Sequence, residues 1–410
     1  MTGDALLGVY DRDLVLVSGK GSWLFDADGN KYLDFAGGVG VNGLGYGDPA
    51  ITRAIRKQSR RLIHASNLYL SPPVQELAER LAAAAFPSKV FFTNSGTEAV
   101  EGAIKFARKI GRSAGRTELV AFERSFHGRT MGALSLTWTA KYREPFEPLV
   151  PGVSFLPWED LGACERAIGP RTAAVFIEPV QGEGGVRPVS SAFLRSLHEL
   201  CRQRGALLVC EEVQCGLGRT GRLFAYEHAG ITPDLLTLAK PLGGGLPLGA
   251  VLLRADLAGA LAPGDHGSTF GGNPVAAAAS LAVLDRLLGK GFVAKVAAKG
   301  EWLTAELLAL KERHPRAIAD VRGLGLMIGI EFHGPAGDVL KGLRADGILA
   351  TKAGDKVLRL LPPLVVRKKE IRRFLASLEG LLAKGAGQPP GPVSVDGHFT
   401  AESAEVAKMS

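Results

Sequence analysis

The sequence contains few cysteines, and none is spaced for a metal site or a redox pair. Only four occur in 410 residues, with no CxxC pair and no histidine at zinc-ligand spacing: Cys164, Cys201, Cys210 and Cys215. Because thiols stay reduced in the cytoplasm and zinc needs closely spaced Cys or His ligands, we expect free cysteines in a cytoplasmic protein. HExxH and EF-hand patterns are also missing, so the sequence predicts no metal ion.

Long apolar runs and blocks of like charge are missing too. No apolar run reaches the length of a membrane span, and residues 1–13 lack the basic and apolar regions of a signal peptide. The 49 basic and 41 acidic residues are interleaved, although the pI is about 9.3. Nucleic-acid binders concentrate basic residues along one segment, so we expect no nucleic-acid or membrane partner. The net charge of +8 favours small anionic ligands.

From about residue 89 onward, short apolar runs alternate with amphipathic helical stretches. The runs are 90–93, 173–178, 206–211, 235–239 and 250–253, with helical periodicity between them, for example in 97–109 and 192–203. This alternation predicts an α/β fold with a mostly parallel sheet covered by helices on both faces. Upstream, Asp28-Gly29-Asn30 predicts a hairpin, and PAITRAIRKQSRRL predicts a helix that begins at Pro49 with Asp48 as its cap.

After Asn273-Pro274 the pattern changes to α+β. A helix is expected to about 288, another over 292–313, short strands near 317–323 and 326–331, and a last helix near 368–382. We therefore divide the chain into an N-terminal segment (1–45), a large domain (46–285), a small C-terminal domain (286–384) and a tail (385–410). The tail has no apolar period, which predicts disorder.

Three of the expected strands end in a polar residue, namely Glu178, Glu211 and Lys240. Ligands of open α/β sheets bind outside the carboxyl ends of the strands, so these side chains are expected to meet in one crevice. Lys240 stands between an apolar run and a Gly-rich turn, where desolvation can lower its pKa and make the amine a nucleophile. Considered alone, it is better interpreted as a surface lysine that begins a loop.

A strand also leads into Asn94-Ser95-Gly96-Thr97, where a helix begins at once. Main-chain N–H groups at a helix N-terminus suit a phosphate, although Ser and Thr also serve as ordinary helix caps. Two Gly-x-Gly-x-x-Gly matches, at 38–43 and 216–221, lack the context of a dinucleotide site, and the second lacks the lysine of a P-loop. A G-x-S-x-G nucleophile elbow is absent.

Together these segments resemble the class III pyridoxal-phosphate-dependent aminotransferases, most closely the acetylornithine aminotransferase group. The resemblance runs from about Val17 to Leu382. It implies an α/β, fold-type I pyridoxal-phosphate transferase with a mostly parallel central sheet in the large domain and a smaller α+β C-terminal domain. It also implies a homodimer with shared active sites. Seven motifs carry it in order: FFTNSGTEAVEGAIKFAR, SFHGRTMGALSLT, IEPVQGEGGV, EEVQCGLGRTGRLF, PDLLTLAKPLGGGLPLGA, HGSTFGGNP and LRLLPPLVV.

The resemblance implies a role for each residue that would bind pyridoxal 5'-phosphate. Lys240 would hold the cofactor covalently as a Schiff base and then move a proton between the substrate Cα and the cofactor C4′. Phe126 would stack on the pyridine ring, unless it simply packs in the core, and Gln214 would approach O3′. The phosphate would be held by Ser95, Gly96 and Thr97, and by Thr269 of the neighbouring subunit.

The same resemblance implies the substrate-binding residues. Arg129 would hold the substrate α-carboxylate with its planar guanidinium, and Ser268 is assigned to the same set. Glu183 and Arg359 would form an ion pair that closes when an acylated ornithine is bound. With 2-oxoglutarate the pair would open, so that Arg359 binds the second carboxylate and no buried charge is left unpaired. Either residue alone could be part of a surface salt bridge.

Glu211 is a departure, because the family pattern has aspartate at this position. That carboxylate keeps the pyridine nitrogen protonated. Glutamate adds roughly 1.5 Å of reach, and misplacement on that scale can cost on the order of a hundredfold in rate. Glu212 cannot substitute, since adjacent side chains of a strand face opposite ways. We expect a working but retuned site. A smaller departure is LGYGDP, where the group has a histidine after Leu-Gly.

These residues predict transamination of the terminal amine of N-acetylornithine with 2-oxoglutarate, giving a semialdehyde and glutamate, in arginine biosynthesis. Succinylornithine, an acylated lysine precursor, free ornithine and 4-aminobutyrate remain alternative donors. A lyase, racemase or aminomutase is disfavoured, because such enzymes need no second-carboxylate switch of the Glu183–Arg359 kind. A non-catalytic paralogue is a further alternative, suggested by Glu211 and opposed by Lys240.

Overall fold

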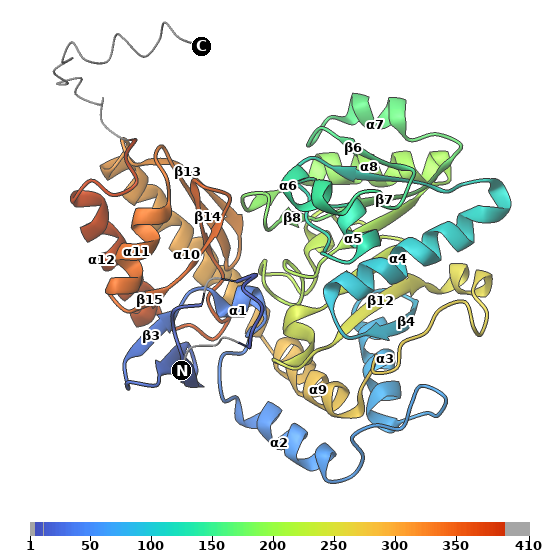
Figure 1. The fold of residues 1–410 in the computed structure, drawn as a ribbon, viewed down its shortest axis with the longest axis horizontal. Coiled ribbons are helices and arrows are strands. Elements are labelled where there is room, and N and C mark those ends of the chain that lie inside the picture. The colour runs from blue at the N-terminus through green and yellow to red at the C-terminus, as the bar shows by residue number, and fades with distance from the viewer. Residues whose placement is uncertain (1–4, 11, 390–410) are drawn as a thin grey trace, which may run out of the picture.

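A seven-stranded sheet forms the centre of the larger part of the molecule in the computed structural model, which describes residues 5–10 and 12–389 (Figure 1). In this sheet β12 runs antiparallel to both of its neighbours, and the other neighbouring pairs are parallel. The α/β fold with a mostly parallel sheet is thus confirmed. The strands, in spatial order, are β4 (Ser88–Thr93), β12 (Gly249–Arg254), β11 (Leu235–Leu238), β10 (Leu207–Glu211), β7 (Thr172–Ile177), β5 (Glu118–Phe122) and β6 (Val153–Leu156).

Helices cover both faces of this sheet. Leu208 and Cys210 of β10 pack in one apolar cluster with Leu197, whereas Val209 between them packs in a second cluster with Phe106. Because strand side chains alternate between faces, a strand buried on both sides reads as a continuous apolar run. The helices of this part are α2 (Pro49–Ser59), α3 (Pro72–Ala84), α4 (Gly96–Gly111), α5 (Met131–Ser135), α6 (Ala140–Arg143), α7 (Leu161–Ala167), α8 (Ser191–Arg204) and α9 (Pro274–Leu288).

The smaller part is a four-stranded antiparallel sheet with helices packed against it, as the α+β pattern predicts. Its strand order is β13-β14-β17-β16. Its elements are α10 (Phe292–Arg313), β13 (Ile318–Leu324), β14 (Met327–Phe332), α11 (Gly337–Ala345), β15 (Ile348–Leu349), β16 (Thr351–Ala353), β17 (Val357–Leu360) and α12 (Lys368–Ala383).

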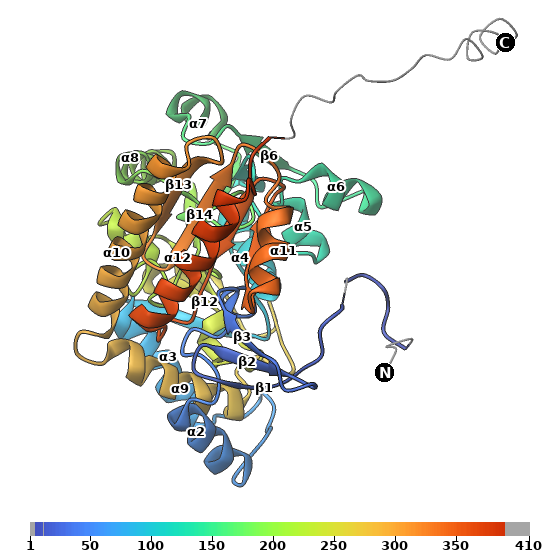
Figure 2. The ribbon, with the colours of Figure 1, turned by 90° about the vertical axis from the view of Figure 1, so that its left-hand side faces the viewer.

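The N-terminal strands lie beside this smaller part, next to α11 and α12 (Figures 1 and 2). β1 (Leu16–Lys20), β2 (Trp23–Asp26) and β3 (Lys31–Asp34) form a sheet that is completed by β15, paired in parallel with β3. The predicted hairpin is present, and Asp26 accepts hydrogen bonds from the N–H groups of Asp28 and Asn30. The division at residues 45, 285 and 384 remains a prediction.

Most predicted elements occur within two residues of their expected bounds, including α4, α8, α9, α10 and α12. The helix that begins at Pro49 is an exception, because it ends at Ser59 and not at Leu62. Asp48 caps it through the N–H groups of Ala50 and Ile51. Residues 60–64 are all exposed, so no packing stabilises a further turn. Among the elements named above, sequence reasoning missed the strands β1, β5, β6, β15, β16 and β17 and the helices α3 and α11.

Three short elements complete the set of α-helices and strands. Short elements α1 (Gly37–Gly40), β8 (Val180–Gln181) and β9 (Arg187–Pro188) lie between the larger ones.

All four cysteines are buried and free. Among the described helices, none combines the length and the hydropathy needed to span a bilayer. Most of the predicted disordered tail, residues 390–410, lies outside the described residues.

Candidate active site

A cavity of about 460 Å³ opens at the carboxyl ends of the parallel strands. The three predicted strand-end residues meet there: Glu178 follows β7, Glu211 ends β10, and Lys240 follows β11. The crevice expected from the order of strands is therefore present. The predicted site residues that line this cavity are Ser95, Gly96, Thr97, Phe126, Arg129, Glu183, Glu211, Gln214 and Lys240.

The segment Ser95–Thr97 places the N-terminus of α4 in the cavity wall. The Ser95 hydroxyl accepts the Glu98 N–H and caps the helix. Gly96 is required by close approach, because a Cβ there would lie 2.6 Å from the Val213 side chain. The Thr97 hydroxyl accepts the N–H groups of Arg129 and Thr130 at 3.3 and 3.2 Å. The helix N-terminus and the Arg129 segment are thereby held together.

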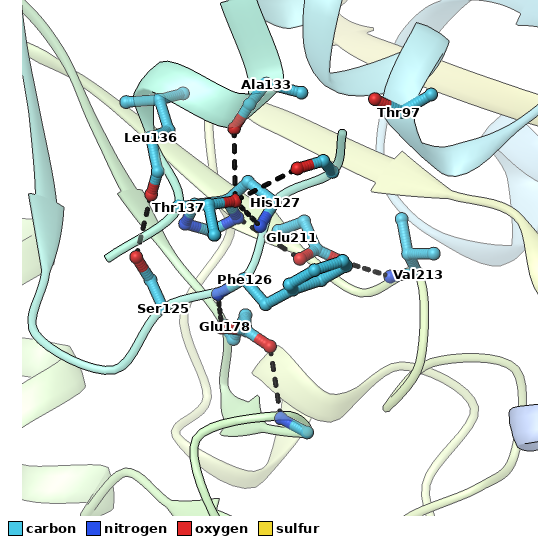
Figure 3. A network of polar contacts seen from close by, with 12 residues as sticks. Thr97, Ser125, Phe126, His127, Ala133, Leu136, Thr137, Glu178, Glu211 and Val213 are labelled. Atoms are coloured by element: carbon cyan, nitrogen blue, oxygen red, sulfur yellow. Dashed lines mark hydrogen bonds and ion pairs between the residues drawn. The ribbon is translucent and has the colours of Figure 1, made fainter. Parts of the chain in front are cut away.

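Glu178 joins two loops of the cavity wall. Its two carboxylate oxygens accept the N–H groups of Phe126 at 3.0 Å and of Gly182 at 3.1 Å (Figure 3). Burial, and then the neighbouring Glu211, raises the pKa of Glu178 well above its ordinary value. Phe126 is only partly buried and faces the cavity, so it is not simply a core residue.

Arg129 stacks on an aromatic side chain that the sequence did not single out. Its guanidinium carbon lies 3.5 Å from the ring centroid of Tyr142 and 5.6 Å from that of Phe126. Such stacking on aromatic faces is favourable for Arg and fixes the plane of the guanidinium. Nothing in the sequence around Tyr142 indicates this contact.

Glu211 is held at both oxygens. Oε1 accepts the Val213 N–H at 2.8 Å, and Oε2 lies 3.2 Å from His127 Nδ1, with both side chains buried (Figure 3). Glu212 points away and accepts the N–H groups of Ala225 and Tyr226, as the alternation of strand side chains predicts. His127 could have been noticed from the sequence, because it stands beside Phe126 in SFHGRT.

Side-chain atoms of His127, Glu178 and Glu211 lie within 4.8 Å of one another, which resembles a metal-ligand set. Each of the four carboxylate oxygens, however, already accepts a hydrogen bond from a main-chain N–H or from the imidazole. Hydrogen bonds within the protein thus already engage every carboxylate oxygen that a metal ion would bind.

Lys240 projects into the cavity from a strained backbone position. Its φ is +42°, in the left-handed region that residues with a Cβ rarely adopt. Part of its surface is open to the cavity while protein atoms surround the amine, and this desolvation lowers the pKa of Lys240. Within the described chain no residue hydrogen-bonds to the amine, so it is available to react.

Arg359 comes from β17, in the smaller part of the molecule; it does not itself line the cavity but contacts two residues that do, Glu183 and Gln214. Only 3% of its side chain is exposed, against 34% for Glu183, with which it forms an ion pair. Its Nη1 also donates to Gln214 Oε1 at 3.3 Å, and its Nε donates to Thr351 Oγ1 at 3.2 Å. The site therefore combines residues from both parts of the chain.

Ser268 and Thr269 are not brought into this cavity. They line a second hollow of about 430 Å³ formed by residues 64–78, 90–92 and 266–274. Ser268 Oγ accepts the Gly271 N–H at 2.9 Å and lies 3.3 Å from Asn94 Nδ2, next to the helix N-terminus. Thr269 is exposed. Large apolar side chains are exposed around it: Ile63, Leu68, Tyr69, Leu70 and Phe270.

Comparison with protein families settles the class of this chain. A model described as aminotransferase class-III matches residues 9–382. The chain belongs to the class III aminotransferases. Acetylornithine aminotransferase 1 from Bradyrhizobium diazoefficiens is 48% identical over 378 residues, covering 91% of this chain and 93% of that protein. Acetylornithine aminotransferase from Methanocaldococcus jannaschii is 46% identical, covering 91% and 94%.

Solved class III structures have the same fold. Ornithine aminotransferase from Toxoplasma gondii ME49 superposes with a TM-score of 0.90 at 32% identity, covering 93% of each chain. N-acetylornithine aminotransferase from Stenotrophomonas maltophilia K279a superposes with a TM-score of 0.80 at 36% identity, covering 92% of this chain and 97% of that one. The predicted family, fold class and cofactor are confirmed: the chain is a pyridoxal-phosphate-dependent aminotransferase of fold-type I.

The residues of the cavity fit this cofactor. Pyridoxal phosphate needs an amine, a phosphate cradle, an apolar surface for its ring and a carboxylate for its ring nitrogen. Lys240 offers an amine whose pKa is lowered by burial, and the α4 N-terminus offers main-chain donors. Phe126 and Glu211 offer the remaining two groups in a cavity of suitable size.

Proposed function

We propose that this aminotransferase moves the terminal amino group of N-acetylornithine, or of a similarly acylated diamino acid, to 2-oxoglutarate. The observation that carries the proposal is the ion pair between the buried Arg359 and Glu183, a residue that lines the cavity. The acylated amine has one carboxylate and 2-oxoglutarate has two. A pocket that serves both needs a cation that is neutralised in one half-reaction and free in the other, because an unpaired buried charge is costly.

The relatives support this donor. Proteins named acetylornithine aminotransferase from bacteria and archaea are 44–48% identical to this chain. The ornithine aminotransferases among the solved structures are 29–33% identical. Free ornithine is therefore the second candidate donor.

Lys240 and Glu211 would carry the chemistry. Pyridoxal phosphate supplies an electron sink for the electron pair left when the amine-bearing carbon loses its proton. Lys240 would hold the cofactor and, once its amine is free, would take that proton and return it at C4′. Its lowered pKa favours the neutral amine that this task needs. Glu211 would keep a proton on the ring nitrogen.

The other cavity residues would bind and orient the cofactor and the substrate. Arg129 would hold the α-carboxylate, Phe126 would lie against the ring, and Gln214 would approach O3′. Ser95, Gly96 and Thr97 would hold the phosphate. Because the Thr97 hydroxyl already accepts two main-chain N–H groups, its contribution would come chiefly from its own main-chain N–H.

An absorption spectrum of the purified enzyme tests the proposal. The visible band of the bound cofactor should bleach with N-acetylornithine and return with 2-oxoglutarate. N-acetylornithine should react at least about tenfold faster than ornithine, succinylornithine or 4-aminobutyrate, as one or two well-placed polar contacts allow. A band that ignores N-acetylornithine but responds to another amine would reassign the donor. A protein that stays colourless with added cofactor would be the non-catalytic paralogue.

We also propose a homodimer in which Thr269 acts on the neighbouring active site. Thr269 is exposed beside five exposed apolar side chains, and such a patch marks a surface that another chain covers. Ser268 reaches Asn94, immediately before the proposed phosphate cradle. A second copy placed here would bring its Thr269 towards that cradle.

Mixing two inactive variants tests the shared site. Thr269→Asp places a negative charge where the phosphate would lie, and Lys240→Ala removes the amine. In a mixed dimer, one site combines the normal Lys240 of one chain with the normal Thr269 of the other. Mixing should therefore restore up to about a quarter of the activity, the statistical share of such intact sites. No recovery from variants that exchange subunits would show that Thr269 serves its own chain.

We further propose that the reaction belongs to arginine biosynthesis in the cytoplasm. The four free cysteines support a reducing compartment. The gene should restore growth without arginine to a bacterium that lacks its own acetylornithine aminotransferase, and the Lys240→Ala variant should not. If neither version of the gene supports growth without arginine, this role is contradicted.

A further inference from the structure

Besides Glu183 and Gln214, the Arg359 side chain has a third partner, Thr351, which takes no part in the ion pair. The two residues face each other across the antiparallel pair β16–β17. Arg359 Nε donates to Thr351 Oγ1 at 3.2 Å. The Thr351 hydroxyl lies 3.5 Å from the Arg359 carbonyl oxygen, towards which its own hydrogen can point. Its lone pairs are then free to accept the Nε–H.

The three contacts are made at two different edges of the Arg359 guanidinium. Thr351 occupies Nε, while Glu183 and Gln214 accept from Nη1. A carboxylate binds Arg through two parallel N–H···O bonds, at either the Nε edge or the Nη1–Nη2 edge. With Nε taken, only the Nη1–Nη2 edge can receive a carboxylate, and Glu183 blocks it while the ion pair is closed.

We infer that Thr351 is a positioning residue that fixes the plane of Arg359 and keeps its Nη1–Nη2 edge for the second carboxylate of the acceptor. The inference rests on the proposed function only in requiring a dicarboxylate substrate. Thr351 touches neither substrate nor cofactor in this role and acts through Arg359. It stays in place when Glu183 leaves, because it is part of the same sheet as Arg359.

The two half-reactions should depend on Thr351 to different degrees. With the amine donor bound, Glu183 neutralises Arg359, and the orientation of the guanidinium matters little. With 2-oxoglutarate bound, Arg359 has lost Glu183 and must present two parallel donors. A Val at position 351 has nearly the same shape but no acceptor, so the buried Nε–H is left unpaired and the guanidinium is free to turn.

Thr351→Val, Thr351→Ser and Thr304→Val, each loaded with cofactor, test the inference. Thr304 lies on α10 in the same part of the molecule, and its hydroxyl makes no hydrogen bond to the described residues, so its variant controls for loss of a hydroxyl. Single-turnover absorbance would give kcat/KM separately for the amine donor, glutamate, 2-oxoglutarate and the monocarboxylate pyruvate.

Thr351→Val should lower kcat/KM for 2-oxoglutarate and glutamate by about 10- to 100-fold, mainly through KM, as expected for an unpaired buried donor. The kcat/KM values for the amine donor and pyruvate should change less than about threefold. Thr351→Ser should restore kcat/KM for the two dicarboxylates. Thr304→Val should change none of these kcat/KM values. An equal loss of kcat/KM for all four substrates would show a merely structural role. Unchanged kcat/KM values for 2-oxoglutarate and glutamate in Thr351→Val would also overturn the inference.

The same experiment distinguishes refutation of N-acetylornithine as the donor from refutation of the role of Thr351. A wild-type enzyme that ignores N-acetylornithine but reacts with glutamate would refute that donor, and the glutamate and pyruvate rates would still test Thr351. A wild-type enzyme that reacts with neither glutamate nor 2-oxoglutarate would overturn both.

Discussion

His127 and Glu211 form a buried pair in the cavity wall, with the imidazole Nδ1 3.2 Å from the carboxylate Oε2. The other oxygen of Glu211 accepts the Val213 N–H at 2.8 Å. Two segments far apart in the sequence thus hold the same carboxylate, at the length of a glutamate side chain. The extra methylene that departs from the family pattern is accommodated by this arrangement.

Shortening this side chain should harm the enzyme. In Glu211→Asp the carboxylate retreats by roughly 1.5 Å, so it can no longer reach both His127 and Val213. We expect weaker cofactor binding and a kcat lower by roughly 10- to 100-fold, measured by absorbance titration and steady-state rates. Glu211→Gln keeps the length and separates the effect of reach from that of charge. A higher kcat in Glu211→Asp would mean that the glutamate is a handicap.

The capture of cofactor by the apoenzyme should depend on pH through Lys240. Burial lowers the pKa of Lys240, and the negative charge of Glu211 opposes this shift more strongly than that of Glu183. Only the neutral amine reacts, so the capture rate should rise with pH to a midpoint below 10.5, the ordinary lysine value. Glu211→Gln removes the charge that raises the pKa, so the midpoint should move to lower pH.

The rate of appearance of the cofactor's visible band, followed from pH 6 to 10, gives these midpoints. Glu183→Gln should shift the midpoint in the same direction but by less. A midpoint that moves to higher pH in Glu211→Gln would contradict the expected sign.

Glu183→Gln should change substrate preference rather than abolish activity. Without the carboxylate, Arg359 stays unpaired in the buried site when an acylated amine binds. The KM for N-acetylornithine should rise by about tenfold or more, while that for 2-oxoglutarate should fall or stay unchanged. Glu199→Gln, an exposed partner of Arg202 on α8, is the matched control and should change neither. Equal effects on both substrates would argue against the switch.

Gly128→Ala should loosen the cavity wall. Gly128 has φ = +139°, and a Cβ there would lie 2.3 Å from Thr97 Oγ1 and 2.8 Å from Ala133. We expect a loss of roughly 2 kcal/mol or more in the free energy of unfolding, together with weaker cofactor binding. Gly115→Ala also carries a positive φ but meets nothing within 4 Å. It should therefore cost only about 1 kcal/mol and leave cofactor binding unchanged, as denaturant titrations would measure.

Sequence reasoning could locate the strand ends because their signal is local. A buried strand must be apolar along its length, so a polar residue at its end stands out, as Glu178, Glu211 and Lys240 do. Parallel strands place those ends at one edge, which is why the structure brings these side chains into one cavity. The roles of individual residues depend on the resemblance and remain predictions.

Other contacts could not be predicted, because they depend on how distant segments meet. Tyr142 lies against Arg129 only after the chain turns through α5 and α6. Thr351 opposes Arg359 because of the register of β16 and β17, two short strands that the sequence did not indicate. The helix at Pro49 ends early because its last predicted residues find nothing to pack against, which is a property of the folded surroundings.

The pairing of β3 with β15 has a consequence for the order in which the protein can fold. Leu33 and Asp34, among the first residues synthesised, find their strand partners at Ile348 and Leu349, more than 300 residues later. Phe35 similarly accepts the Leu361 N–H. On the ribosome, β3 of a nascent chain can pair with β2, but its other edge must stay unpaired until most of the chain has been translated. The smaller part, which carries the Arg359 that pairs with Glu183, is therefore completed last.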